Sequence, residues 1–184
     1  MATDLTALIA GFQISVEATA KKAVDLSVPE AVLGMAKSLA FAFGSGLGEA
    51  DQIFWDRRAI AADGDDPLDL VGTLTNPYGA LINFANIKAI AIFNRSDETL
   101  THADGSHTAT DASIVFLDTS STFQGPCKTL AKGHVLEAGG MYMVTNPLAA
   151  GWTVTLDTGD TFEVDNEDAA DEALYDIVLI GDST

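Results

Sequence analysis

The sequence predicts an all-β fold: an antiparallel β-sandwich of the jelly-roll type, preceded by an N-terminal arm of mixed or extended structure. Two observations support this prediction. From residue 51 onward, about eight short apolar runs are separated by turn-forming residues such as Asp63-Gly64-Asp65-Asp66-Pro67. No segment with helical periodicity lies between these runs, which argues against a parallel sheet with crossover helices.

The expected strands follow one another at short intervals. Their ranges are 53–60, 68–74, 87–94, 113–118, 134–137, 141–144, 152–156, 161–164 and 174–181. The strand at 87–94 carries apolar residues on both faces, so we expect it to be central in a sheet and covered on both sides. Gly139-Gly140 and Thr158-Gly159-Asp160 each separate two expected strands, and they predict two β-hairpins.

The first 48 residues differ from the rest of the chain. They are rich in alanine and leucine, and residues 1–60 carry only five basic and seven acidic groups, a net charge of −2. Phe12, Ile14 and Val16 alternate with polar residues, which is typical of a strand. A nearly neutral apolar arm is suited to docking on another subunit, so these three residues are candidate interface residues.

The second half of the arm leaves one alternative open. Residues 31–42 fit a helix that begins after Ser27, with Glu30 completing a capping box. They also fit a strand, because residues 38–43 alternate. The glycine-rich segment 44–48 predicts a flexible hinge. We therefore expect an arm or anchor at residues 1–48 and a β-sandwich domain at residues 49–184.

The chain is strongly acidic, and this charge argues against two classes of partner. Its 27 acidic and nine basic residues give a net charge of −18, and residues 61–184 carry −16 of it. Such a surface repels nucleic-acid backbones and anionic membrane surfaces, so we expect neither as a partner. The first residues lack the basic region of a signal peptide, so we expect synthesis in a cytoplasm.

The sequence offers no strong catalytic or cofactor-binding motif, and we expect neither enzyme activity nor a cofactor. His102 and His107 lie in a polar stretch, and His134 stands three residues before Glu137. The His-x-His pattern of a cupin metal site is absent, as are a nucleophile elbow and a phosphate-binding loop. The single cysteine, Cys127, cannot form an intrachain disulfide, and we expect a buried, inert thiol.

Calcium is the one cation for which the sequence leaves the question of binding open. Two turns are crowded with carboxylates: Asp63, Asp65, Asp66 and Asp69 in the first, and Asp165, Glu167, Asp168, Asp171 and Glu172 in the second. Calcium takes roughly six to eight oxygen ligands and often finds them in such loops. Neither run has the spacing of an EF-hand, so we expect solvated acidic loops rather than a calcium site.

Two arginines and one tryptophan have alternative interpretations. Arg57 and Arg58 follow Asp56 in an acidic chain, so they pair with carboxylates either on a neighbouring subunit or in ordinary surface salt bridges. If their partners lie on a neighbouring subunit, Arg57 and Arg58 are candidate interface residues in addition to those of the arm. Trp152 lies near a loop and is compatible with a sugar-binding platform, although most aromatic residues are expected in the core.

Several segments in a fixed order carry a resemblance to a known group of proteins. They are GSGLGEADQIFWDRRAIAA at 44–62, LDLVGTLT at 68–75, GA at 79–80, FANIKAI at 84–90, TGD at 158–160 and YDIVLIG at 175–181. This order resembles small virion proteins encoded by tailed bacteriophages. The resemblance implies a structural virion protein, either a capsid decoration or head-fibre protein or a small tail component. It also implies a homotrimer that binds the major capsid protein or other virion proteins.

Two other functions stay open at this point, and both rank behind the virion protein. A carbohydrate- or receptor-binding module would bind glycans through Trp152. A metal-dependent jelly-roll enzyme would use His134 and Glu137.

Overall fold

The computed structural model of the chain describes residues 8, 10–21, 30–96, 114–117, 121–123, 125–126 and 133–183. The regular elements within these residues are β-strands, and none of the residues described forms a helix long and apolar enough to cross a membrane. The strands are β1 Ala10–Lys21, β2 Glu30–Phe43, β3 Glu49–Ala50, β4 Gln52–Ile60, β5 Asp65–Asp69, β6 Val71–Thr75, β7 Leu81–Asn83, β8 Asn86–Asn94, β9 Ile114–Phe116, β10 His134–Leu136, β11 Met141–Thr145, β12 Trp152–Thr153, β13 Thr161–Asn166 and β14 Ala173–Asp182.

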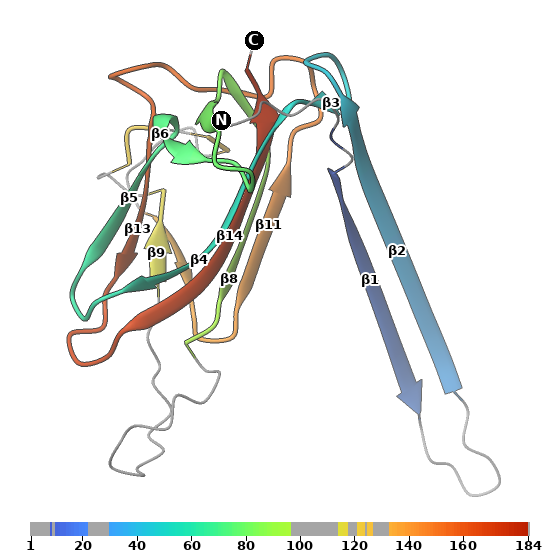
Figure 1. Ribbon diagram of the computed structural model, residues 1–184. Coiled ribbons are helices and arrows are strands. Elements are labelled where there is room, and N and C mark those ends of the chain that lie inside the picture. The colour runs from blue at the N-terminus through green and yellow to red at the C-terminus, as the bar shows by residue number, and fades with distance from the viewer. Residues whose placement is uncertain are drawn as a thin grey trace, which may run out of the picture.

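The body of the molecule consists of two facing antiparallel sheets (Figure 1). The smaller sheet has the strand order β10-β9-β13-β5, and the larger has the order β11-β8-β14-β4 with the short β12 paired to β8. Alternate side chains of both sheets meet in one buried core, which includes Phe54, Leu74, Ile82, Ile90, Phe116, Phe162 and Ile177. The predicted all-β antiparallel sandwich is confirmed.

β14 and β8 form the centre of the larger sheet. β14 pairs with β4 on one side and with β8 on the other, and β8 also pairs with β11. Ile92 stands opposite Ile177, and both are buried in the sandwich core. Ala89, on the other face of β8, is buried beneath the arm. The prediction of a central strand at 87–94, covered on both sides, is confirmed along this part of β8.

Of the two predicted hairpins, the one at Gly139-Gly140 does not form, and the one at Thr158-Gly159-Asp160 is reduced to an isolated antiparallel bridge between Thr155 and Gly159. Gly139-Gly140 joins β10 to β11, but β10 pairs with β9 in the smaller sheet and β11 pairs with β8 in the larger. Likewise, β12 pairs with β8, whereas β13 pairs with β5 and β9. A glycine-rich turn predicts that the chain reverses, but not which strand becomes the neighbour. In a sandwich the chain can cross from one sheet to the other at such a turn.

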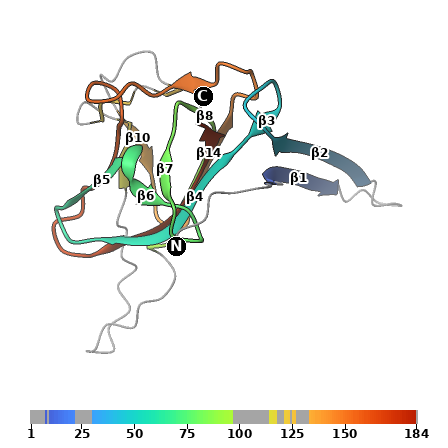
Figure 2. The same ribbon diagram turned by 45° about the horizontal axis from the view of Figure 1, so that its top comes forward.

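The arm is a long β-hairpin that projects beside the body (Figures 1 and 2). Its strands β1 and β2 pair antiparallel from Ala10 opposite Phe41 to Lys21 opposite Glu30. Of the two alternatives for residues 31–42, the strand is therefore correct, because pairing with β1 overrides local helix propensity. Ser27, the expected helix cap, lies outside the described residues. The two-residue β3 pairs parallel with the end of β2 and leads into the body.

Candidate functional site

The hairpin has one apolar face and one more polar face, because successive side chains of a strand point to opposite sides. The cross-strand pairs at alternate positions on the apolar face are Ala10–Phe41, Phe12–Leu39, Ile14–Lys37 and Val16–Met35. The opposite face begins with the pairs Gly11–Ala40, Gln13–Ser38 and Ser15–Ala36. The strand predicted from Phe12, Ile14 and Val16 is confirmed as β1, while the role of these residues at a subunit interface stays a prediction.

The base of the apolar face packs against the outer surface of the larger sheet. A second buried cluster forms there, and its members are Ala10, Phe41, Ala50, Ala89 and Ile180. Phe12 and Leu39 of the hairpin pack at the edge of this cluster, next to Val178 of β14. The hairpin and the sheet are thus complementary where they meet.

Farther from the body the apolar face is uncovered. Ile14 is exposed, and Met35 keeps 60% of its surface exposed. Val32, on the opposite face of the same strand, is equally exposed at 60%. We call Ile14, Met35 and Lys37 the distal hairpin face. A two-stranded hairpin is marginally stable alone in water, and these side chains gain no cover within one copy.

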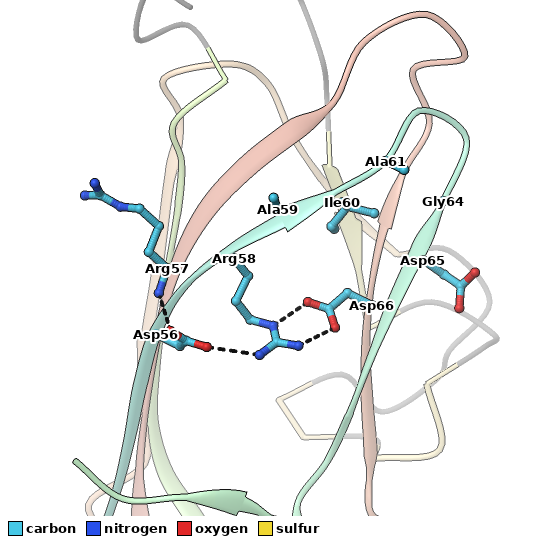
Figure 3. Close-up of a pocket in the computed structure, with 9 residues that line it drawn as sticks. All are labelled: Asp56, Arg57, Arg58, Ala59, Ile60, Ala61, Gly64, Asp65 and Asp66. Carbon is cyan, nitrogen blue, oxygen red and sulfur yellow. Dashed lines mark hydrogen bonds and ion pairs between the residues drawn. The ribbon is translucent and has the colours of Figure 1, made fainter. Parts of the chain in front are cut away.

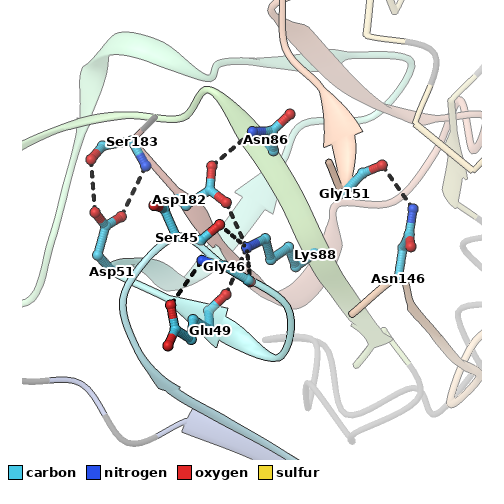
Figure 4. Close-up of polar contacts among 10 residues, drawn as sticks. All are labelled: Ser45, Gly46, Glu49, Asp51, Asn86, Lys88, Asn146, Gly151, Asp182 and Ser183. Carbon is cyan, nitrogen blue, oxygen red and sulfur yellow. Dashed lines mark hydrogen bonds and ion pairs between the residues drawn. The ribbon is translucent and has the colours of Figure 1, made fainter. Parts of the chain in front are cut away.

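A buried lysine holds the turn that joins the hairpin to the body (Figure 4). Lys88 of β8 donates hydrogen bonds of 2.8–3.0 Å to three backbone carbonyl oxygens, those of Ser45, Gly46 and Glu49. Its Nζ atom also lies 2.6 Å from Oδ2 of Asp182 at the end of β14. Both charged side chains are fully buried. We call this set of contacts the turn clamp.

Neighbouring bonds complete the turn clamp. Asn86 donates a side-chain hydrogen bond of 2.8 Å to Oδ1 of Asp182, and the Glu49 carboxylate accepts one of 2.9 Å from the backbone N–H of Gly46. The segment predicted as a flexible hinge, residues 44–48, is therefore a bonded turn. A buried ammonium group is costly without oxygen partners, so it holds the turn carbonyls in place. The division of the chain at residue 48 stays a prediction.

Beyond the hairpin base, the outer surface of the larger sheet is largely apolar and partly exposed. The strand register places two rows of residues there: Trp55, Val178, Ala91 and Met143 in the first, and Arg57, Asp176, Phe93 and Met141 in the second. Trp55 is 62% exposed, and Phe93 and Met141 are exposed as well. We call these eight residues the outer sheet face. A contiguous apolar patch of this kind indicates an interaction surface.

The hairpin and the larger sheet diverge away from the hairpin base (Figure 1), and a hollow lies between them. The hollow has a volume of about 190 Å³ and is lined by Phe12, Ile14, Lys37, Leu39, Met143, Thr145 and Pro147. The turn clamp holds the chain immediately after β2. The hairpin therefore cannot swing down onto its own sheet without disturbing these buried bonds.

Arg57 lies on the outer sheet face and pairs within its own chain. Its Nε atom donates a hydrogen bond of 2.8 Å to Oδ1 of Asp176. Nη1 of Arg95 lies 3.0 Å from the other oxygen of the same carboxylate. Two guanidinium groups therefore meet at the carboxylate of Asp176 on this face.

Arg58 joins the two sheets of the sandwich (Figure 3). Its Nε and Nη2 atoms donate to the two oxygens of Asp66 on β5, and its Nη1 atom donates to Asp56. Tyr175 of β14 donates its hydroxyl to Asp66 at 2.7 Å. Both Arg57 and Arg58 therefore have carboxylate partners in the same chain, and a place for them at a subunit interface stays a prediction.

The groups around Asp66 shift one another's pKa values. Burial by itself would raise the pKa of Asp66, but hydrogen bonds from Arg58 and Tyr175, together with the charge of Arg58, outweigh burial and lower it. The hydrogen bond to Asp66 raises the pKa of Arg58 above its ordinary value. Burial, followed by the bond to Asp66, raises the pKa of Tyr175. The three groups thus keep a stable arrangement of guanidinium, carboxylate and neutral phenol.

The pairing of β5 with β13 brings the two acidic runs together. Carboxylates from both runs line an open hollow of about 410 Å³ on this side of the smaller sheet: Asp63, Asp65, Glu163, Asp165 and Glu167. Among the residues that the structure describes, no group of three or more potential ligands is arranged to hold a metal ion. These carboxylates therefore place negative charge on the smaller sheet, whereas the outer sheet face belongs to the larger sheet.

The other candidate residues contribute to packing. The His134 ring stacks on Phe116 with ring centroids 5.4 Å apart and lies 5.0 Å from the ring of Tyr142. Trp152 is half-buried and packs against the sandwich core, and a role for it in sugar binding stays a prediction. His102, His107 and Cys127 lie outside the described residues.

The sequence analysis missed both the turn clamp and the outer sheet face. A signal for the first is Lys88 itself, the one charged residue within the apolar stretch Ile87–Phe93. A signal for the second is Trp55, a large apolar residue that follows another, Phe54, on the opposite face of the same strand.

Comparison with known proteins gives no relative: no family model, no curated protein and no solved structure matches the chain.

Proposed function

We propose that the chain is a structural, non-enzymatic component of a phage virion, a capsid decoration or head-fibre protein that assembles with copies of itself and docks on the shell. The observation that carries this proposal is the projecting hairpin, whose distal face of Ile14 and Met35 is uncovered within one copy. A hairpin of this kind needs a further apolar surface, and a symmetric assembly supplies one.

The strand order supports the jelly-roll form of the sandwich. We number the eight main strands along the chain, from β4 as the first to β14 as the eighth, and leave out the short strands β6, β7 and β12. In this numbering the larger sheet has the strand order 6-3-8-1 and the smaller sheet has the order 5-4-7-2. This is the arrangement expected of two Greek keys wound into a jelly roll. Viral capsid proteins use this fold, as do lectins and cupins, so the fold agrees with a virion role without deciding it.

The distribution of charge supports an orientation for the protein. The acidic hollow around Asp65 and Glu163 belongs to the smaller sheet, whereas Arg57 and Arg95 lie beside Asp176 on the larger sheet. Contact between the acidic side and packaged DNA would be repulsive. The acidic side therefore faces away from the particle, and the side with the hairpin faces its assembly partners.

Light scattering of the purified full chain tests the assembly part of this proposal. We expect a closed oligomer, and for a trimer three times the monomer mass of 19.2 kDa. Mass spectrometry of purified phage particles tests the location, since the chain should occur at a fixed ratio to the major capsid protein. A monomer at every concentration, together with absence from particles, would contradict the proposal.

A further inference from the structure

We infer that a second copy of this chain covers both the outer sheet face and the distal hairpin face, entering the space where the hairpin and the sheet diverge. This inference rests on the proposed function, because it names the partner and the surface of the assembly. Three observations support it: the fit of the two surfaces at the hairpin base, the turn clamp, and the local charge.

The chain itself shows that the two surfaces fit each other. At the hairpin base, Phe41 packs with Ala89 and Ile180 in a dry cluster. Both surfaces continue outward from this contact, the sheet to Val178 and to Trp55 in the same row, and the hairpin to Met35. A second copy presents the same two surfaces, so it supplies apolar cover of the kind already used at the base.

The chain's own hairpin cannot supply this cover. The turn that follows β2 is held by hydrogen bonds from the buried Lys88 to the carbonyl oxygens of Ser45 and Gly46. Moving the hairpin onto its sheet would leave a buried ammonium group without these partners, which is costly. The hairpin direction is therefore set within one copy, and the remaining apolar surface must be covered from outside.

Charge decides where two copies can approach. Each copy carries a net charge of −18, so most orientations are repulsive. The outer sheet face differs from the acidic hollow, because Arg57 and Arg95 lie there beside Asp176 and Lys37 lies on the facing hairpin. A basic partner protein would instead be attracted to the acidic hollow of the smaller sheet. The observations therefore favour a second copy at this face.

Four single substitutions in the full chain test the inference, in two matched pairs. Met35→Glu alters the distal hairpin face, and Val32→Glu places the same charge on the opposite face of β2, where exposure is also 60%. Trp55→Ser alters the outer sheet face, and Tyr78→Ser removes another exposed aromatic residue, one that is 69% exposed in the turn between β6 and β7. Because all four side chains are exposed, each variant should stay folded, which thermal unfolding checks.

Light scattering over a dilution series gives the readout. We expect Met35→Glu and Trp55→Ser each to weaken self-association about tenfold or more, and Val32→Glu and Tyr78→Ser to match the parent. The inference requires that Met35→Glu and Trp55→Ser both weaken self-association. If the parent assembles and at least one of these two variants associates as tightly as the parent, the inference is overturned while the proposed function stands. If the parent is a monomer throughout, the assembly proposal and the inference both fail.

Discussion

The Nζ atom of Lys88 and the Oδ2 atom of Asp182 lie 2.6 Å apart, and both side chains are fully buried. Among the described residues Oδ2 has no hydrogen-bond partner, so it meets the ammonium group as an ion pair. The pair brings together three distant parts of the chain: the turn after β2, the start of β8 and the end of β14. The direction of the N-terminal hairpin therefore depends on the last strand of the sandwich.

Replacing the lysine of this pair should destabilise the protein strongly. In Lys88→Met, Asp182 is left as an unpaired buried carboxylate and three carbonyl oxygens lose a donor. We expect the free energy of unfolding to fall by about 3–5 kcal/mol, measured by urea denaturation. Limited proteolysis should also cut the turn at 44–48 faster than in the parent.

The double variant Lys88→Met with Asp182→Leu is the matched control. Removing both charges together avoids an unpaired buried group, so part of the lost stability should return. Equal loss in the single and double variants would mean that the ion pair is not what stabilises this region.

Gly181 should tolerate no side chain, because β14 is irregular beside it. The pairing of β14 with β8 shifts register between Ile180 and Gly181, and a Cβ atom at Gly181 would overlap the carbonyl oxygen of Asn86. We expect Gly181→Ala to lower the free energy of unfolding by about 1–3 kcal/mol, through overpacking. Gly34→Ala in β2 is the control, since a Cβ atom there meets nothing within 4 Å. Equal stability of the two variants would contradict this account of the bulge.

The lowered pKa of Asp66 predicts a pH dependence of stability. Because its pKa in the folded chain lies below the ordinary value of 3.8, the carboxylate stabilises the fold above that value. This contribution is lost as the pH falls through the folded pKa. Asp66→Asn should therefore be less stable than the parent by about 1–3 kcal/mol near pH 7, a figure reduced because Arg58 is partly exposed.

The difference between Asp66→Asn and the parent should shrink as the pH falls below 3.8 and through the lower pKa that Asp66 has in the folded chain. Urea denaturation at neutral pH and at a series of acidic pH values measures this difference in the free energy of unfolding. Asp65→Asn is the control. Asp65 precedes Asp66 in the sequence, but it is exposed and lies outside the network that Asp66 forms with Arg58 and Tyr175. A difference that does not change with pH would show that Asp66 acts through shape rather than charge.

Salt should strengthen self-association. Each copy carries a net charge of −18, and screening of this repulsion is weak at low ionic strength. We expect the dissociation constant to fall when the ionic strength rises from about 0.01 M to about 0.15 M, as measured by sedimentation or light scattering. A rise instead would point to an interface built from opposite charges, contrary to the apolar surface inferred here.

The strands of the body could be predicted because their signals are local. The long apolar stretch that became β14, for example, needs no knowledge of its neighbours to be recognised as a strand. Residues 31–42 stayed ambiguous, because only their partner β1 decides between strand and helix. The predicted hairpin at Gly139-Gly140 was wrong because pairing partners are set by packing across the sandwich, which a glycine turn does not encode.

The candidate site was predictable only in part. Phe12 and Ile14 could be assigned to an apolar strand face from their alternation alone. The turn clamp could not, because Lys88 and Asp182 are far apart in sequence and meet only where the pairing of β8 with β14 shifts register. Trp55 could not be recognised as exposed, because apolar residues occupy both faces of β4 and only the fold shows which face is covered.

The central claim is that a second copy covers the outer sheet face, and the fluorescence of Trp55 tests it most directly. Trp152→Phe leaves Trp55 as the only tryptophan, and phenylalanine keeps an aromatic ring against the core. Within one copy Trp55 is 62% exposed, so it should emit as a solvated indole at high dilution. We predict a shift to shorter wavelength as the concentration rises and the oligomer forms. An oligomer in which Trp55 keeps the emission of a solvated indole would contradict the claim.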